Sequence, residues 1–506
     1  MSDWAEGYIT EVGYIHRYHP HLLPRLLAFA ALSRGVAAPG GGSEKIRVLE
    51  LGCGQGVSAN IIAAVNPNID YTALDFNPSH ISGARALAAA AGTPNLRFVE
   101  ASFEDMADER SWGCFDIILL HGIYSWVSAT NREHIVRIAR EKLRAGGMLY
   151  LSYNTYPGWA TIAPIRRMFV DIAQDNPSAP IFDQLDHGFG VFDRLHQLKS
   201  RYIEAIPNLV NRIEQLKTHD RRYIAHEYLN KEWKIFHFSD VVKDMARAKL
   251  SYVGSANLLD HLDGINLTDE QREFLATIRN PIRRESVRDL IVNQSFRRDI
   301  FLKGVIPMSE ARIQNGWADL RFALSTNAAS VPRDAQGVQF HGTHRIVHER
   351  VLEKLDSGPR TTSELLQEPE ISSQSGAFRQ VMVYLVGQGN CHVVPAESNE
   401  DERIRRAEAL NGVILNDARD WNVLASPVLG GAVEVNDIAQ LMLLAVREKS
   451  ADPAGFIWNI LRSQNKKLVK DGKPLDSEEE NVAELHRKVI ETQTDKGRVL
   501  AKLKVC

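Results

Sequence analysis

The stretch Val48-Leu49-Glu50-Leu51-Gly52-Cys53-Gly54-Gln55-Gly56 decides the fold that we predict for this chain. A continuous apolar-rich run, residues 46–51, leads into the glycines, and a helical pattern begins at Ser58. Glycine lets the backbone turn sharply and pass close beneath a ligand. The order of strand, glycine loop and helix therefore predicts a nucleotide-containing cofactor at the end of the first strand.

Two classes of cofactor fit such a loop. A dinucleotide site has the pattern Gly-x-Gly-x-x-Gly, but Val57 stands here where the third of those glycines would be. Glu50 lies just before the glycines, where its carboxylate suits the ammonium group of S-adenosylmethionine better than a pyrophosphate. Asp75 ends the next strand and can accept both ribose hydroxyls in either class, so it does not discriminate. The loop as a whole favours S-adenosylmethionine.

Apolar runs and helical stretches alternate after the glycine-rich break at 37–43. The expected strands are residues 46–51, 71–75, 96–99, 115–121 and 148–153, and the expected helices are 58–65, 78–91 and 131–144. Strands without period-two alternation are typical of a parallel sheet that helices cover on both faces. The fold class is therefore α/β, and residues 44–175 are predicted to form a Rossmann-like, doubly wound cofactor-binding domain.

Three other regions complete the predicted organisation. Residues 1–43 are expected to form an N-terminal helical or lid segment, and residues 176–330 a mostly helical middle domain with solvated, charged helix faces. Residues 335–506 are expected to form a C-terminal α+β region, in which 343–395 follow the helix and strand order of a winged-helix-like unit. A chain that ends near residue 175 is expected to retain cofactor binding, because its parallel sheet includes the glycine loop.

Composition excludes several functional classes. The 506 residues include 60 Lys and Arg against 63 Asp and Glu, so bulk charge does not favour nucleic acid. Apolar runs are too short to span a bilayer, and the N-terminus lacks the layout of a signal peptide. The expectation is a soluble, cytoplasmic protein without nucleic-acid partners or integral membrane association.

A metal site is not expected either. The four cysteines, Cys53, Cys114, Cys391 and Cys506, form no Cys-x-x-Cys pair, which argues against zinc and against a disulfide framework. His16, His19 and His21 lie close together in the sequence, but a lid or helix entry rich in aromatic residues explains them better than a metal centre.

The chain resembles the class I S-adenosylmethionine-dependent methyltransferases over residues 44–155. Two segments, HGIYSWV at 121–127 and SYNTYPGW at 152–159, resemble those of bacterial methyltransferases that carry a methyltransferase regulatory domain. The best-described branch of that family comprises the rickettsial protein lysine methyltransferases. Shorter stretches at 226–229, 252–257, 293–299 and 425–427 extend the resemblance to most of the chain. The N-terminus departs from the family, because Tyr8 is not followed by the Asp and Pro of the family pattern.

The loop and the resemblance together imply the site residues. The cofactor-binding residues are expected to be Glu50, Gly52, Gly54, Gly56, Asp75, Phe76, Ser102, Phe103 and His121. The catalytic and acceptor-side residues are expected to be His121, Tyr124, Trp126, Tyr153 and Asn154, with Trp159 as a further wall. His121, at its ordinary pKa of about 6.5, is a candidate proton acceptor.

The methyl acceptor that the resemblance implies is a protein lysine. An apolar aromatic channel would lower the pKa of its ammonium group and so favour the reactive amine. Small-molecule O- or N-methylation is an alternative, and so is a non-catalytic S-adenosylmethionine sensor. Nucleobase amines are disfavoured because residues 121–124 lack the Asn/Asp-Pro-Pro-aromatic motif. A homodimer is compatible with the long helical extension.

Overall fold

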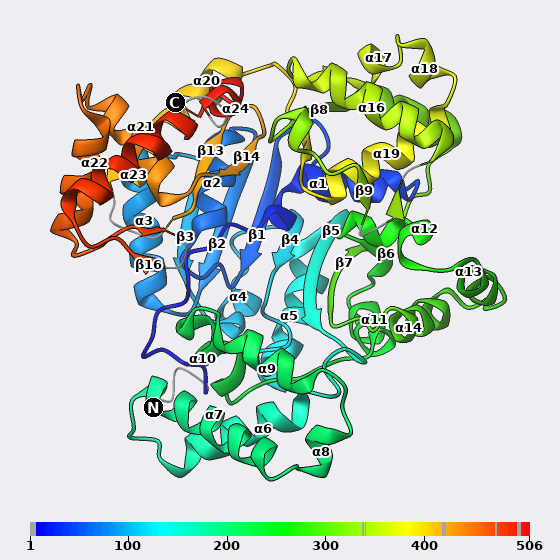
Figure 1. The fold of residues 1–506 in the computed structure, drawn as a ribbon. Helices are drawn as coiled ribbons and strands as arrows, with labels where there is room; N and C mark the ends of the chain where they lie inside the picture. Colours follow the sequence, from blue (N-terminus) through cyan, green and yellow to red (C-terminus); the bar gives the residue numbers. More distant parts are fainter. Residues whose placement is uncertain are drawn as a thin grey trace.

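A seven-stranded sheet of order β3-β2-β1-β4-β5-β7-β6 forms the centre of the computed structural model (Figure 1). The structure describes residues 7–335, 338–339, 341–416, 421–470, 473–492 and 497–505, so Cys506 lies outside the described residues. The strands are β1 (Ile46–Leu51), β2 (Ile69–Asp75), β3 (Leu96–Glu100), β4 (Phe115–Leu120), β5 (Leu143–Asn154), β6 (Ser251–Ser255) and β7 (Phe296–Leu302). Strands β1 to β5 are parallel, whereas β7 is antiparallel to both β5 and β6.

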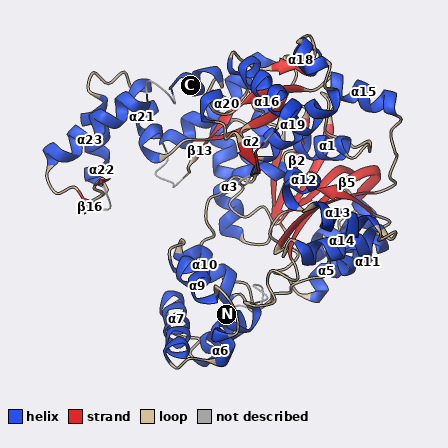
Figure 2. Cartoon of the chain, turned by 45° about the vertical axis from the view of Figure 1, so that its right-hand side comes forward, coloured by secondary structure: helices blue, strands red, loops and turns tan. Residues whose placement is uncertain are grey.

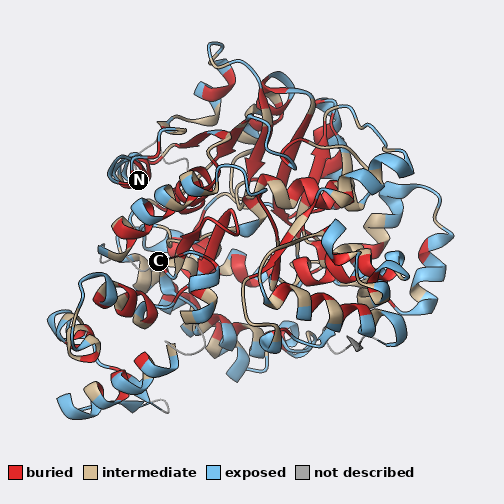
Figure 3. Cartoon of the chain, turned by 90° about the horizontal axis from the view of Figure 1, so that it is seen from above, coloured by how far each residue is buried: buried red, intermediate tan, exposed pale blue. Residues whose placement is uncertain are grey.

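Helices cover both faces of this sheet, which confirms the predicted Rossmann-like α/β fold. The covering helices are α1 (Pro24–Ser33), α2 (Val57–Val65), α3 (Pro78–Ala91), α4 (Phe103–Asp108), α5 (Ala129–Lys142) and α11 (Phe238–Arg247). Val48 packs into a core with α1, α2 and α3, while the next residue, Leu49, packs into a core with α4, α5 and α11. Successive side chains of a strand point to opposite faces, so both faces must be apolar, and the central strands are buried (Figure 3).

The sheet extends beyond residue 175, where the sequence-based boundary was drawn. Strands β6 and β7 come from the region that was expected to be a helical middle domain, and β7 pairs with β5 from Met148–Leu302 to Asn154–Phe296. Most of that region has the sequence pattern of helices, so the two short strands were not predicted from the sequence. The cofactor-binding fold and the middle region are therefore one continuous sheet structure.

A group of helices, which we call the helical cap, lies beside the edge of the sheet at which β1 ends (Figures 1 and 2). The cap consists of α6 (Ala163–Asp175), α7 (Ile181–Gln197), α8 (Arg201–Glu204), α9 (Leu209–Lys217) and α10 (Arg221–Leu229). It has its own apolar core, to which Ile9 contributes. The backbone N–H of Ile9 donates to the Asn230 Oδ1 atom at 3.0 Å. The N-terminal segment is thereby tied to the cap.

The C-terminal region contains a helical unit and an outer group of helices. The unit contains α16 (Gly342–Asp356), β11 (Arg360–Thr361), α17 (Thr362–Leu365), α18 (Pro369–Ser372), α19 (Ser375–Gly387) and β12 (Cys391–Val394). Its sheet has the order β11-β8-β12, so the central strand β8 (Arg321–Leu324) comes from a segment before the predicted unit. Helix α20 (Glu400–Asn416) packs on α2 and α3, and the hairpin of β13 (Val423–Ser426) and β14 (Gly431–Glu434) packs on α2.

Shorter or more peripheral elements complete the chain. They are η2 (Pro20–Leu22), η3 (Leu258–His261), α12 (Asp263–Asn266), α13 (Asp269–Ala276), α14 (Pro281–Ile291), α15 (Glu310–Ala318), η4 (Ala328–Ser330), β9 (Asp334–Ala335), β10 (Val338–Gln339), α21 (Asp437–Arg447), α22 (Pro453–Ser463), β15 (Val469–Lys470), β16 (Lys473–Pro474), α23 (Glu478–Glu491) and α24 (Gly497–Lys502). Within the described ranges, no helix combines the length and apolar character that a membrane span requires.

Candidate functional site

The glycine loop between β1 and α2 adopts a conformation that requires glycine. Gly52, Gly54 and Gly56 have φ angles of +75°, +53° and +68°, a region that residues with a Cβ atom rarely adopt. A Cβ atom on Gly52 would lie 2.3 Å from the Cδ1 atom of Ile123. At Gly54 a Cβ atom would meet nothing within 4 Å, so the loop backbone faces open space there. The loop thus presents its main chain to a ligand.

Asp75, at the end of β2, holds this loop in place. The residue is only 6% exposed, and its Oδ2 atom accepts the backbone N–H of Gly54 at 2.9 Å. Its Oδ1 atom accepts the backbone N–H of Asn77 at 2.9 Å and lies 3.3 Å from the Nδ1 atom of His80. The carboxylate is therefore oriented at the cavity edge before any ligand binds.

Glu50 is a buried carboxyl group in the floor of the same site. It is 4% exposed, and its Oε2 atom accepts the hydroxyl of Tyr71 at 2.8 Å. Burial raises the pKa of Glu50 to about 7, against which the Tyr71 hydrogen bond acts only in part. A cationic ligand group beside Glu50 would favour the ionised form.

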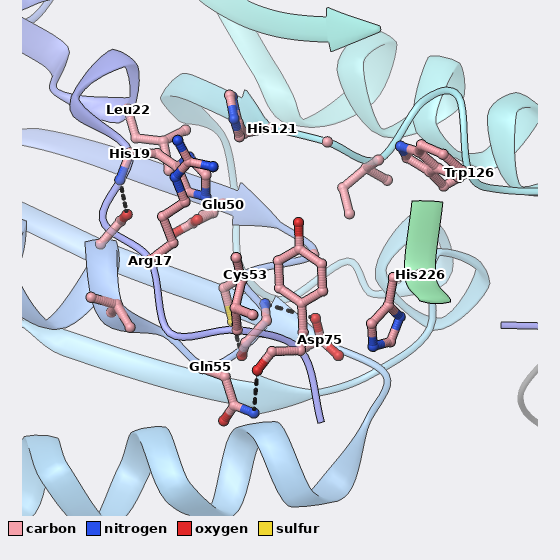
Figure 4. A pocket seen from close by; sticks show the side chains of 18 of the residues that line it. Arg17, His19, Leu22, Glu50, Cys53, Gln55, Asp75, His121, Trp126 and His226 are labelled. Atoms are coloured by element: carbon pink, nitrogen blue, oxygen red, sulfur yellow. Dashed lines mark hydrogen bonds between the residues drawn. The ribbon is translucent and has the colours of Figure 1, made fainter. Parts of the chain in front are cut away.

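These residues border a cavity of about 1240 Å³ at the carboxyl edge of the sheet (Figure 4). Its lining includes all nine predicted cofactor-binding residues: Glu50, Gly52, Gly54, Gly56, Asp75, Phe76, Ser102, Phe103 and His121. The N-terminal segment contributes Arg17 and His19 beside Glu50 and His121, whereas Trp126 and His226 lie on the opposite side (Figure 4). One cavity therefore joins the glycine loop, the N-terminal segment and the cap.

His121 belongs to a cluster of uncharged histidines. Its ring centroid lies 4.1 Å from that of His19, and its Nδ1 atom lies 2.7 Å from the hydroxyl oxygen of Tyr150. Burial and the neighbouring His19 and His21 hold the pKa of His121 well below its usual value, and burial lowers the pKa of His19 to about 4 and of His21 to about 3. His121 is thus a weaker proton acceptor than its ordinary pKa suggested. No metal-binding group of three or more His, Cys, Asp or Glu side chains occurs in the described part of the chain.

Two residues predicted for the acceptor side lie behind the cavity wall. The Tyr124 hydroxyl donates to the Asp244 Oδ2 atom at 2.9 Å, and the Tyr153 hydroxyl donates to the Asp299 Oδ2 atom at 2.5 Å. Both tyrosine side chains are almost fully buried, and neither residue lines the cavity. Their placement at or after strand ends suggested a wall. Both rings pack instead into the apolar core that includes residues of α11 and β7.

Trp126, Asn154 and Trp159 do line the cavity. The rings of Trp126 and Trp159 lie 6.3 Å and 5.3 Å from that of Trp233. The backbone N–H of Asn154 donates to Ser125 Oγ at 2.9 Å, which holds the residue in place. Its side-chain Nδ2 atom is buried and has no hydrogen-bond partner among the described residues. An unpaired buried donor is costly, so this amide marks a position for a ligand acceptor.

The sequence reasoning missed three charged residues of the cavity. Arg17 and Arg298 contribute positive charge near the histidine cluster, and the Nε atom of Arg298 is buried without a hydrogen-bond partner among the described residues. Glu227 lies on α10, and burial raises its pKa to about 7. Only the resemblance at 226–229 pointed to this helix, because a single acid among many charged helix residues carries no signal of its own.

Comparisons with known proteins identify the family. A family model described as "Methyltransferase domain" matches residues 43–177, and one described as "Predicted methyltransferase regulatory domain" matches residues 220–303. Uncharacterized protein sll1526 of Synechocystis is 35% identical over 505 residues, which cover 99% of each chain. This chain belongs to the S-adenosylmethionine-dependent methyltransferases that carry a regulatory domain.

Two further relatives of the methyltransferase are rickettsial. Uncharacterized protein RP789 of Rickettsia prowazekii is 29% identical over 335 residues, which cover 61% of the methyltransferase and 59% of the relative. The structure of PKMT2 from Rickettsia typhi in complex with AdoHcy matches with a TM-score of 0.71 at 18% identity, covering 97% of the methyltransferase and 100% of PKMT2. The fold is therefore shared along the whole length. The regulatory-domain match includes α10, β6 and β7, so that domain both completes the sheet and borders the cavity.

Proposed function

We propose that this methyltransferase transfers the methyl group of S-adenosylmethionine to a lysine side chain of a protein. The observation that carries the proposal is the cavity, which the glycine loop and Asp75 line together with Trp126 and Asn154. The fold of PKMT2 along the whole chain and the resemblance to rickettsial protein lysine methyltransferases support the same substrate class.

The residues of the cavity floor fit this cofactor. Asp75 would accept the ribose hydroxyls, since its two oxygens are buried and already oriented. Glu50 and Arg17 would bind the ammonium and the carboxylate of the amino-acid end. Phe76 and Phe103 would lie against the adenine. The open space above the Gly54 backbone leaves room for the ligand to pass over the loop.

The chemistry is an in-line displacement, for which S-adenosylmethionine supplies an activated methyl group on a positively charged sulfur. The protein has to align the acceptor nitrogen and exclude water. The flat walls of Trp126 and Trp159 suit a lysine side chain, because aromatic faces attract an ammonium and also pack on its methylene groups. The unpaired Asn154 amide would donate to an acceptor oxygen of the substrate backbone or cofactor.

A transfer assay with methyl-labelled S-adenosylmethionine tests this proposal. Purified enzyme is incubated with a lysine–alanine copolymer, and the products are analysed by mass spectrometry. Methylated lysine supports the proposal, and label only in small molecules of a cell extract would favour small-molecule methylation instead. Cofactor binding without any transfer would favour a sensor. Asp75→Asn is the matched control, since it keeps the side-chain shape and should lose both binding and transfer.

A further inference from the structure

Glu227 carries a carboxylate that the protein leaves without a partner. It lies on α10 and borders the cavity, yet no hydrogen bond or ion pair reaches its side chain from the residues that the structure describes. Arg166 on α6 is a cation that lowers the pKa of Glu227. The Arg166 guanidinium, however, donates to the backbone carbonyls of Glu227 and Asn230, at 2.8 Å and 2.6 Å, and not to the Glu227 carboxylate. Glu227 is partly exposed at the cavity and has no paired cation among the described residues, so a cationic group of a ligand can serve as its partner.

Tyrosine side chains share the cavity with this carboxylate. Tyr8 and Tyr14 from the N-terminal segment and Tyr223 from α10 line the cavity together with Glu227, and the Glu227 carboxylate helps to raise the pKa of each tyrosine. The Tyr8 and Tyr14 rings pack on the His226 ring, with centroids 5.3 Å and 5.2 Å apart. Burial raises the pKa of each of these tyrosines, so their hydroxyls stay neutral. A carboxylate and neutral tyrosine rings that line one cavity suit an ammonium group.

The titratable and charged groups near Glu227 leave it available as a base. They are Arg166 of α6, Tyr223 and Tyr228 of α10, and Tyr8 and Tyr14 of the N-terminal segment. Burial outweighs the pull of Arg166 and raises the pKa of Glu227 to about 7. The cavity histidines His121 and His226 do not compete for the proton, because burial lowers the pKa of each.

We propose that Glu227 binds the ammonium group of the methyl acceptor and removes its proton before transfer. This inference rests on the proposed function. The proton moves from the acceptor nitrogen to a Glu227 oxygen, and the freed lone pair forms the new N–C bond. The C–S bond breaks, and its electron pair remains on sulfur. The charge is balanced at each step. The ammonium and the carboxylate first become a neutral amine and a carboxylic acid, and the positive charge then moves from sulfur to the acceptor nitrogen.

Binding of n-butylammonium, which has the shape of a lysine side chain, tests the site without turnover. Ligand is added to the complex with S-adenosylhomocysteine, and the fluorescence of the cavity tryptophans Trp126 and Trp159 is followed. The wild-type protein should prefer n-butylammonium to the uncharged n-butanol by about ten-fold or more. Glu227→Gln should lose that preference, whereas Glu204→Gln, which removes an exposed carboxylate from the same cap, should keep it. The assignment would be overturned if Glu227→Gln preferred n-butylammonium as strongly as the wild type does, or if the wild type showed no such preference.

The pH profile of methylation separates a base from a structural residue. The wild-type rate on the copolymer should level off above pH ~7, whereas the Glu227→Gln rate should be about 100-fold lower at pH ~7 and rise about ten-fold per pH unit toward the amine pKa of ~10.4. Affinity for S-adenosylhomocysteine should stay within about three-fold. An unchanged profile, or an equal loss of cofactor affinity, would remove Glu227 from this role. A wild-type enzyme that binds n-butylammonium through Glu227 but methylates no lysine would refute the proposed substrate alone.

Discussion

Affinity for the cofactor should weaken as the pH falls below about 7, because Glu50 then binds a proton. In the proposed binding mode, the ammonium of S-adenosylhomocysteine pairs with the ionised carboxylate. The ionised fraction falls about ten-fold per pH unit below the pKa. S-adenosylhomocysteine should therefore bind about ten-fold more weakly at pH ~6 than at pH ~8. Isothermal titration calorimetry across this range measures the effect, and titrations in two buffers measure the proton released on binding.

Glu50→Gln isolates this group. Glutamine can still accept the Tyr71 hydroxyl, but it cannot ionise, so the pH dependence should disappear. At pH ~8 the variant should lose a charge-assisted hydrogen bond of ~1.5–3 kcal/mol, which is roughly ten- to 150-fold in affinity. At pH ~5.5 the two proteins should converge.

The stability of the unliganded protein should change in the opposite direction. Because the folded-state pKa of Glu50 lies above its ordinary value of 4.5, its stabilising contribution is complete below that value and is lost as the pH rises through about 7. The difference corresponds to roughly 3 kcal/mol. Glu50→Gln should thus be more resistant to urea than the wild type at pH ~8, by up to about that amount.

Tyr71→Phe provides the matched control for the mechanism. It removes the hydrogen bond that lowers the Glu50 pKa, so the midpoint of the affinity profile should move to higher pH. A wild-type affinity that stays constant between pH ~5.5 and ~8.5, or a Glu50→Gln profile with the wild-type slope, would refute the pairing of Glu50 with the cofactor ammonium.

Three other predictions follow from the packing. Gly52→Ala should bind S-adenosylhomocysteine at least about ten-fold more weakly by calorimetry, because its Cβ would lie 2.3 Å from the Ile123 side chain at a φ of +75°; unaltered affinity would contradict the strain. Tyr153→Phe should lower the free energy of unfolding in urea by ~1.5–3 kcal/mol through loss of the buried hydrogen bond to Asp299, with little change in cofactor affinity. Unchanged stability with a weaker cofactor affinity would indicate instead that Tyr153 contacts the ligand. Residues 1–175 alone should not fold to a cofactor-binding protein, because β5 loses its partner β7. Circular dichroism and calorimetry measure this, and tight cofactor binding would support the domain boundary at residue 175 that the sequence predicted.

The residues that the sequence assigned to the cofactor line one cavity for a physical reason. Gly52 and Asp75 sit at strand ends, where chain direction alone brings them to one edge of a parallel sheet. The acceptor half was harder, because the same reasoning placed Tyr124 and Tyr153 in the wall. Their hydroxyls instead pair with Asp244 and Asp299, from segments more than a hundred residues away.

The sequence by itself determined the parallel sheet, the glycine loop and the cofactor class, since each depends on residues that are close in the chain and on side-chain spacing. Only the tertiary structure decided that β6 and β7 complete the sheet and that Glu227 joins Tyr8 and Tyr14 at the cavity. Those relations depend on contacts between segments that are distant in the sequence. In such contacts, burial rather than residue type determines whether a charged or aromatic side chain packs in the core or lines the ligand cavity.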